Sequence, residues 1–142
     1  MPGFSDLFEF ILAEWLLVAA WLWLIFALLW LNRMRSGERI SSIQLVRMIN
    51  RGPPVIVDLR PSHEFSAGHI KGAVNIPATK IAKSLHQLEK HREEPLVLVC
   101  SLGQAAPGVA RTLGEAGYNR VHCLVRGVLG WSDDNLPLVK KN

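Results

Sequence analysis

The sequence predicts an α/β domain that follows a membrane-spanning helix. After residue 38, short runs rich in valine and isoleucine alternate with segments of helical periodicity. This pattern is typical of a mostly parallel, doubly wound sheet flanked by helices. Before that point, Trp15–Leu31 contains no charged residue, which is typical of a helix that crosses a bilayer. The 142 residues therefore have room for one domain and one anchor.

The predicted span is residues 15–31, between a leader at 1–14 and a linker at 32–38. As a helix it would be about 25 Å long, and starting it at Phe10 gives about 33 Å. These lengths bracket the roughly 30 Å hydrocarbon core. The run is apolar on every side, which excludes a helix that lies along the interface. It lacks the basic start and small-residue cleavage site of a secretory signal, so we expect an uncleaved anchor.

The charges around the span predict its orientation and partners. Only acids precede it, whereas Arg33, Arg35 and Arg39 follow it at once. By the positive-inside tendency, the C-terminal part is cytoplasmic and the amino terminus lies outside. The net charge is +4, but the bases are scattered and no basic-aromatic motif occurs. We therefore expect anionic lipid, and no nucleic acid, as the partner of this charge. Two cysteines without zinc spacing predict a reduced compartment and no metal.

The domain is predicted at residues 39–138, before a tail at 139–142. Its first strand is brief, at 39–40. The others are expected where short apolar runs end at proline, glycine or polar clusters, at 55–58, 73–76, 96–99 and 120–125.

Helices are predicted between these strands. A capping box at 41–44 opens a helix to about residue 50, with Ile43, Val46 and Ile49 facing inward. Ser62 is expected to cap a short helix at 63–67 that Gly68 ends. A continuous helix is predicted over 79–90, with one apolar face made by Ile81, Leu85 and Leu88. Two more helices are expected, at 109–116 and 127–131.

Cys100 ends the most apolar of the strands, Leu96–Val99. Four apolar residues predict a strand buried on both faces, and Pro107 lies where a first helical turn accepts a proline. A thiol at the carboxyl end of such a strand faces the crevice where open α/β sheets bind ligands. Loop N–H groups and the helix behind them would favour the thiolate. Cys100 is therefore a candidate nucleophile; the alternative is a small core residue.

Two stretches resemble the signatures of the rhodanese family. Val57–Pro77 holds Asp-x-Arg, a Glu-Phe four residues on, and then Gly-His-Ile, Gly-Ala and Asn-Ile-Pro, while Gly127–Trp131 with Leu136–Leu138 resembles the closing signature. The likeness extends over about 39–138, and Cys100 falls where the family keeps its sulfur-carrying nucleophile. With its span, the chain is similar to bacterial single-domain rhodanese-like proteins anchored in the inner membrane.

The resemblance implies a five-stranded parallel sheet and sulfur transfer through a cysteine persulfide. The donor or acceptor would be a thiol or a protein, and no cofactor is implied. In this interpretation Cys100 attacks the outer sulfur of the donor, and preorganised hydrogen-bond donors then hold the anion.

The loop after Cys100 supplies the candidate binding residues. Its successive amides are expected to curl around one point, with Gly103 free to take a positive φ. The family's loop often carries a cation or a hydroxyl near its end, where this chain has alanines, so small anionic donors such as thiosulfate are expected to bind poorly. The candidates are Ser101, Leu102, Gly103, Gln104, Ala105 and Ala106, of which Ser101 and Gln104 could add side-chain donors.

Other conspicuous residues are interpreted as structural. Arg60 and Glu64, four residues apart, are expected to pair and hold the turn after the second strand. His69 is expected to be a structural hydrogen-bonding residue, and Cys123 a core residue. Arg126 stands where the family often has glycine, a change without a physical account at this level.

Three functions are compatible with these observations. The first is a membrane-tethered sulfurtransferase that uses Cys100. The second is a catalytically weak or inactive docking module that binds a membrane protein complex, which the alanines of the loop favour. The third is a cysteine-based phosphatase or arsenate reductase, which would need an arginine to clamp the oxyanion. No arginine lies between Cys100 and Arg111, so the third is disfavoured and the first is preferred.

Overall fold

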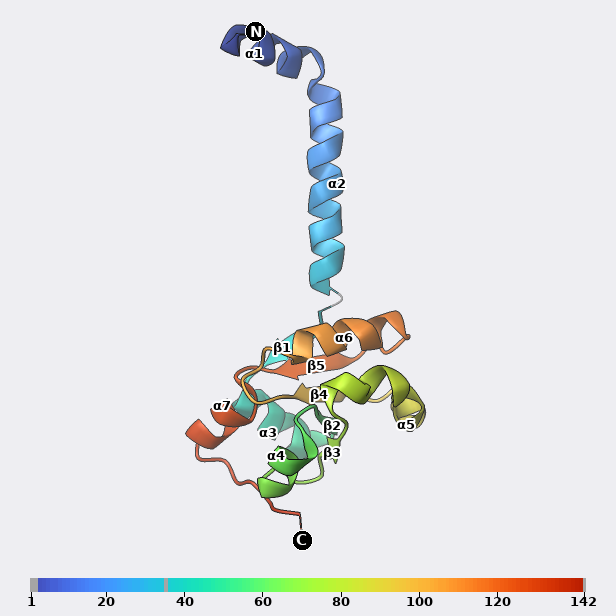
Figure 1. Cartoon of the computed structure of the whole chain (residues 1–142), viewed down its shortest axis with the longest axis vertical. Helices are drawn as coiled ribbons and strands as arrows, with labels where there is room; N and C mark the ends of the chain where they lie inside the picture. Colours follow the sequence, from blue (N-terminus) through green and yellow to red (C-terminus); the bar gives the residue numbers. More distant parts are fainter. Residues whose placement is uncertain (1–2, 35, 142) are drawn as a thin grey trace. The chain divides into compact units, whose positions relative to one another are not determined.

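The computed structural model describes residues 3–34 and 36–141 and divides into two compact units, Met1–Met34 and Arg35–Asn142. In the first unit, α1 (Phe4–Ala13) is followed by α2 (Trp15–Met34), and the chain bends at Glu14 (Figure 1). Among the described residues, one helix is long and apolar enough to cross a membrane, Trp15–Arg33. The predicted span lies within it, and the leader contains a helix that the sequence analysis did not predict.

The second unit is built on a parallel sheet in the order β1-β5-β4-β2-β3. Every neighbouring pair of strands is parallel, which confirms the predicted α/β fold with a doubly wound, five-stranded sheet. Because α2 runs to residue 34 and β1 begins at residue 38, only a short connection is left of the expected linker at 32–38. The strands are β1 (Glu38–Ile40), β2 (Val55–Asp58), β3 (Val74–Asn75), β4 (Leu96–Val99) and β5 (Val121–Leu124).

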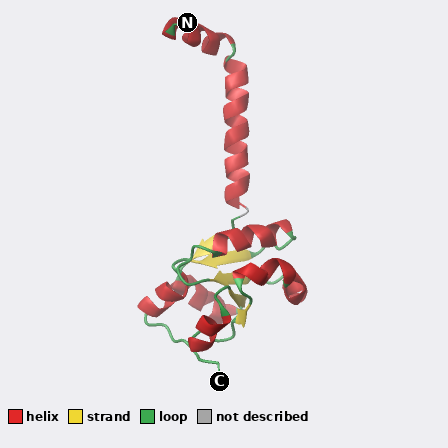
Figure 2. Cartoon of the chain, viewed as in Figure 1, coloured by secondary structure: helices red, strands yellow, loops and turns green. Residues whose placement is uncertain are grey.

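Helices and tight turns connect the strands and flank the sheet (Figure 2). Pro107 lies in the first turn of its helix, as expected, although that helix begins at residue 106 rather than 109. The elements are α3 (Ser42–Arg51), α4 (Ser62–Ala67), the 3-10 helix η1 (Ala78–Lys83), α5 (Leu85–Leu88), the 3-10 helix η2 (Glu89–His91), α6 (Ala106–Glu115) and α7 (Gly127–Asp133).

β4 is buried on both faces, and its side chains alternate between two cores. Leu96 and Leu98 belong to the cluster that α6 and η1 cover, whereas Val97 and Val99 belong to the cluster that α3 and α7 cover. Cys100 continues this alternation and lies in the α6 cluster. The register of the central strand therefore decides which face of the sheet receives the thiol.

The helix α3 begins as predicted but buries a different stripe. Ser41 accepts the Gln44 N–H on its Oγ at 3.3 Å and donates its own N–H to Gln44 Oε1 at 2.7 Å, which confirms the capping box. The inward position expected for Ile43 is wrong, because its side chain is 62% exposed while Leu45 is fully buried. Ile43 points about 120° away from Ile49 around the helix axis, so both cannot face one core.

The continuous helix expected over 79–90 is also wrong. Tight turns interrupt the segment: the Ser84 N–H donates to Ile81 O at 3.0 Å, and the Gln87 N–H donates to Ser84 O at 3.0 Å. Such i→i+3 turns are narrower than an α-helix, and they interrupt its regular hydrogen bonding and axis. Ile81 and Leu88 are nevertheless buried, and Leu85 packs partly against the same cluster. The apolar face was therefore predicted correctly, and the regular helix was not.

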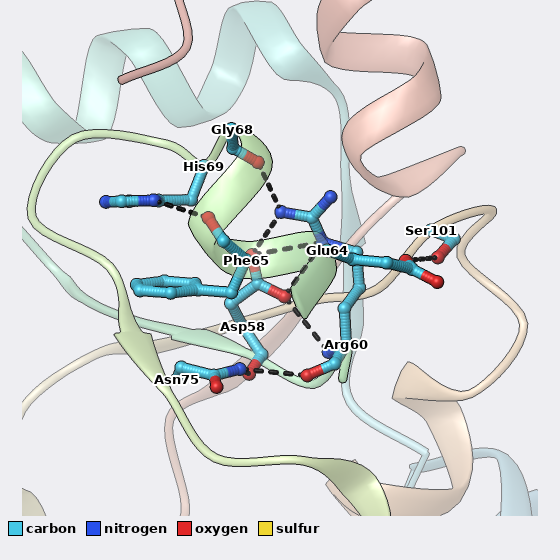
Figure 3. A network of polar contacts seen from close by, with 8 residues as sticks. All are labelled: Asp58, Arg60, Glu64, Phe65, Gly68, His69, Asn75 and Ser101. Carbon is cyan, nitrogen blue, oxygen red and sulfur yellow. Dashed lines mark hydrogen bonds and ion pairs between the residues drawn. The ribbon is translucent and has the colours of Figure 1, made fainter. Parts of the chain in front are cut away.

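A buried ion pair holds the turn between β2 and α4 (Figure 3). Arg60 Nη2 lies 2.8 Å from Asp58 Oδ2, and it also donates to Gly68 O at 2.6 Å. The expected pair between Arg60 and Glu64 is therefore wrong, because Asp58, two residues before Arg60, reaches the guanidinium inside the fold. The capping role expected for Ser62 is wrong too: Pro61 is the N-cap residue of α4.

The predicted structural role of His69 is confirmed. Its Nδ1 lies 2.8 Å from Phe65 O, and the imidazole stacks on the Phe65 ring with the centroids 3.9 Å apart. The His69 backbone also pairs with Val139 in both directions at 2.8 Å, which joins the end of the chain to the turn after α4.

We predict that Arg60→Ala destabilises the domain by about 3–5 kcal/mol, because it leaves the Asp58 carboxylate buried without its partner. Arg111→Ala is the matched control: it breaks the exposed Arg111–Glu115 pair, which is worth less than about 1 kcal/mol. Urea unfolding of the full-length chain in detergent micelles, followed by circular dichroism, measures both. Equal effects of the two substitutions would contradict the assignment of this ion pair as a structural element.

Candidate active site at the end of the central strand

Cys100 directly follows β4 and is 5% exposed. A loop of five residues then leads into α6, so the thiol lies between the carboxyl end of the central strand and the start of a helix. The neighbouring strands β2 and β5 end at the same edge of the sheet. The loops that follow these strands therefore begin at the same edge of the sheet as the cysteine.

The loop turns back so that a backbone N–H reaches the sulfur. Gly103 N–H donates to Cys100 Sγ with the nitrogen 3.0 Å from the sulfur. Gly103 has φ +82°, and a Cβ built on it would lie 2.8 Å from the Arg126 nitrogen. The positive φ expected at Gly103 is therefore confirmed, and a close approach to the loop after β5 also leaves no room for a Cβ there. An N–H aimed at sulfur stabilises the anionic form of that sulfur.

The first turn of α7 holds the backbone of this loop from the other side. Val128 N–H donates to Cys100 O at 2.8 Å, and Leu129 N–H donates to Ser101 O at 3.1 Å. Gly127 makes this approach possible, since a Cβ there would lie 1.9 Å from Cys100 O, and its φ is +55°. Gly127 was visible in the closing signature, but the sequence analysis did not assign this role to it.

The backbone of Arg126 takes a conformation that glycine adopts without strain. Arg126 has φ +61° and lies in the left-handed region, where a side chain is disfavoured. Its guanidinium pairs with the Asp133 carboxylate at the surface of α7. The charge of Arg126, the N-cap residue of α7, is thus partly compensated by a carboxylate in the last turn of that helix.

Ser101 has a different partner from the one expected. Its hydroxyl donates to Glu64 Oε2 at 3.1 Å (Figure 3), so this donor is engaged with a carboxylate rather than available to a sulfur anion. The contact joins α4 to the loop after Cys100 and places a negative charge at the edge of the site. This role of Glu64 was not predicted from the sequence, because the two residues are 37 positions apart.

The remaining candidate residues divide by burial. Leu102, Gln104 and Ala105 are exposed, whereas Ala106 is fully buried in the α6 core. Any contact between Ala106 and a substrate would therefore involve its backbone. In the described part of the chain, the N–H groups of Leu102, Gln104 and Ala105 have no intramolecular acceptor. These three N–H groups are therefore not engaged within the described part of the chain.

Cys123 is a core residue, as predicted. It lies on β5 in the same cluster as Cys100, and its Sγ is 3.6 Å from Ser36 O. Burial, reinforced by the neighbouring Cys100, raises the pKa of the Cys123 thiol to about 11. A thiol that remains protonated at neutral pH is a poor nucleophile. No cluster of His, Cys, Asp or Glu that could hold a metal occurs among residues 3–34 and 36–141.

Comparison with known proteins gives a consistent result. The sequence profile of the family described as "Rhodanese-like domain" matches residues 41–134. The Escherichia coli K12 protein YibN is 33% identical over 140 residues, which cover 96% of this chain and 98% of YibN. The thiosulfate sulfurtransferase GlpE of Shewanella oneidensis is 35% identical over 102 residues, 72% of this chain and 99% of GlpE.

A solved structure shows the same fold. The rhodanese-related protein of Thermoplasma volcanium superposes with a TM-score of 0.67 at 21% identity, covering 73% of this chain and 99% of that protein.

We predict that Gly127→Ala displaces the loop after Cys100, because the new Cβ would overlap Cys100 O and the positive φ would be strained. Gly108→Ala is the matched control, since that position in α6 has no atom within 4 Å of a Cβ. Urea unfolding should show a loss of more than about 2 kcal/mol for Gly127→Ala. It should show no loss, or a gain of up to about 1 kcal/mol, for Gly108→Ala. A tolerated Gly127→Ala would mean that the loop does not need this contact.

Proposed function

The chain belongs to the rhodanese-like domain family, and from that premise we propose that it is a membrane-anchored sulfurtransferase that carries sulfane sulfur as a persulfide on Cys100. The observation that carries the proposal is the Gly103 N–H aimed at Cys100 Sγ at 3.0 Å. A cysteine that served only as a core residue would not need a loop folded to put a donor on its sulfur.

The proposed reaction consists of two displacements at sulfur. The Cys100 thiolate attacks the outer sulfur of a donor persulfide, the donor's S–S bond breaks, and the donor leaves as a thiolate with the bonding electron pair. Cys100 is left as the persulfide anion. An acceptor thiolate then attacks the outer sulfur and releases the Cys100 thiolate. Electrons balance within each displacement, so neither an oxidant nor a cofactor takes part.

The loop supports this chemistry through its backbone. The free N–H groups of Leu102, Gln104 and Ala105 provide donors for the negative charge of the persulfide, and Gly103 N–H is already at the inner sulfur. Such preorganised donors stabilise developing charge without reorganisation. The loop has no cationic side chain, and no arginine lies between Cys100 and Arg111. This absence also disfavours the phosphatase hypothesis.

A thiol or protein persulfide is the donor that this loop fits better than thiosulfate. The relative from Shewanella oneidensis is a thiosulfate sulfurtransferase. In this chain Ala105 stands at the exposed rim of the loop, and the Glu64 carboxylate lies at its edge. A dianionic donor would meet backbone amides and one negative charge, with no cationic side chain in the loop itself. A protein donor could instead contact the exposed Leu102 and Leu129 beside the loop.

We propose that α2 anchors the chain in the bacterial inner membrane, with the domain cytoplasmic and the amino terminus outside. The length and composition of Trp15–Arg33 support the span, and the arginines at 33, 35 and 39 support the orientation. A cytoplasmic domain is consistent with two free cysteines that act as thiols.

A second candidate function is a docking module for a membrane protein complex. It is favoured by the exposure of Leu102 and Leu129, at 55% and 48%, on the rim of the site. Two apolar side chains next to a nearly buried cysteine provide a small contact surface whether or not sulfur is transferred. Persulfide formation distinguishes the two functions.

We predict that the full-length chain, incubated with a low-molecular-weight persulfide, gains one sulfur atom on Cys100. Intact-mass measurement and peptide mapping after alkylation detect it. Cys100→Ser should abolish the gain, while the matched control Cys123→Ser should retain it, because Cys123 is buried and protonated. If the chain never gains sulfur on Cys100, the enzyme proposal fails and the docking module is the better account.

We further predict that Ala105→Arg raises kcat/KM for thiosulfate by about one to two decades. A hydrogen bond to a charged group is worth roughly 1.5–3 kcal/mol, which corresponds to this factor. Asn119→Arg, which adds the same charge before β5 and away from the carboxyl ends of the strands, should have no effect. Steady-state assay with cyanide as acceptor measures both. Equal rates for the two variants would show that a missing cation does not limit this activity.

A further inference from the structure

The helix α1 is amphipathic and has no buried residue. At 100° per residue, its apolar side chains span an arc of about 200°, and its polar or small side chains span about 100° on the opposite side of the helix. Asp6 also accepts the Gly3 N–H at 2.8 Å, which closes the first turn of the helix. The polar arc consists of Ser5, Asp6, Glu9 and Ala13, and the apolar arc of Phe4, Leu7, Phe8, Phe10, Ile11 and Leu12.

This pattern differs from that of α2, which is apolar on every side. The two helices are joined through a single residue, Glu14, whose φ of −108° and ψ of 25° interrupt the helical path. A continuous helix from residue 4 to residue 34 would be about 46 Å long, well beyond the roughly 30 Å hydrocarbon core. It would also bring Asp6, Glu9 or Glu14 into the core, where carboxylates are costly.

We infer that α1 lies along the bilayer surface at the end where α2 begins, with its apolar arc among the upper acyl chains and its carboxylates in water. This inference rests on the proposed membrane anchor. The short connection to α2 indicates that lipid covers the apolar arc. Ala13 is two residues from Trp15, the first residue of α2, so α1 cannot move away from the membrane surface once α2 spans it. The arc is therefore held at the interface, where its aromatic and aliphatic side chains partition favourably.

The charge of α1 predicts which lipids it needs for membrane contact. Interfacial helices commonly use lysine and arginine to bind anionic lipid, but α1 carries only acids. Its contact with the membrane is therefore apolar and does not need anionic headgroups. The helix would fix the depth of α2 at this end, because Glu14 cannot move into the hydrocarbon while α1 stays at the surface.

Site-directed fluorescence of the full-length chain in phosphatidylcholine vesicles tests the inference. Single cysteines replace Leu7 or Ile11 on the apolar arc, Ser5 or Glu9 on the polar arc, and Leu22 in α2, each in the Cys100→Ser chain. The parent Cys100→Ser chain gives the background from the buried Cys123. Each site carries a polarity-sensitive dye, which is quenched either by iodide in water or by spin labels attached at shallow or deep positions of the lipid.

The expected result is a helical alternation. Dyes at 7 and 11 should emit at shorter wavelength, resist iodide and respond most to the shallow lipid quencher, while dyes at 5 and 9 should be quenched by iodide. Adding phosphatidylglycerol should not strengthen the lipid contact at 7 and 11. A dye at 22 should respond most to the deep quencher.

Four other results would each contradict the anchor or the interfacial position of α1. If the dye at 22 is not quenched by lipid, the anchor proposal fails and the interfacial helix fails with it. If 22 behaves as expected but all four α1 sites are open to iodide, α1 is free in water. Quenching of all four by the deep label would show that α1 continues the span. Protection of 7 and 11 from both quenchers, lost on dilution with lipid, would show that a second copy of the chain covers the apolar arc.

Discussion

The candidate site depends on a backbone contact between two loops that are distant in the sequence. Cys100 O accepts the Val128 N–H at 2.8 Å, and this distance is possible only because Gly127 has no Cβ to meet the same oxygen. Gly103 meets the loop after β5 in a similar way, at Arg126. Two glycines thus let the loops after β4 and β5 pack backbone to backbone. The N–H of Gly103 is directed at Sγ as a result.

Strand order brings the other parts of the site to the same edge. β4 lies between β2 and β5 in a wholly parallel sheet, so the loops that follow all three strands begin side by side. On the β2 side, the buried pair of Asp58 and Arg60 holds the turn that leads to α4. That helix then presents Glu64 to Ser101. The same topology therefore supplies backbone donors from one neighbour of Cys100 and a carboxylate from the other.

These contacts favour sulfur transfer through a persulfide over reaction with a doubly charged donor such as thiosulfate. A neutral N–H directed at a nearly buried sulfur can stabilise a persulfide, which carries a single charge. This N–H is a weaker match for a doubly charged donor, because the rim holds the Glu64 carboxylate and an alanine at position 105. The exposed Leu102 and Leu129 add an apolar surface at the same place. The proposed sulfur carrier and the docking module thus share one surface and differ only in whether Cys100 reacts.

The sequence by itself determined the fold class, the five strands, the apolar α2 and the position of Cys100 after the central strand. These depend on local composition and periodicity, which neighbouring residues supply. It failed where the three-dimensional fold decides which of several side chains is buried and which partner it meets. Arg60 binds Asp58 rather than Glu64, Ile43 faces solvent while Leu45 is buried, and Ala106 belongs to the core rather than to the loop surface. Only the tertiary structure decided these outcomes, because burial against the sheet selects the side chains that face inward. The role of Gly127 depends in addition on two loops that are distant in the sequence and that the sheet brings together.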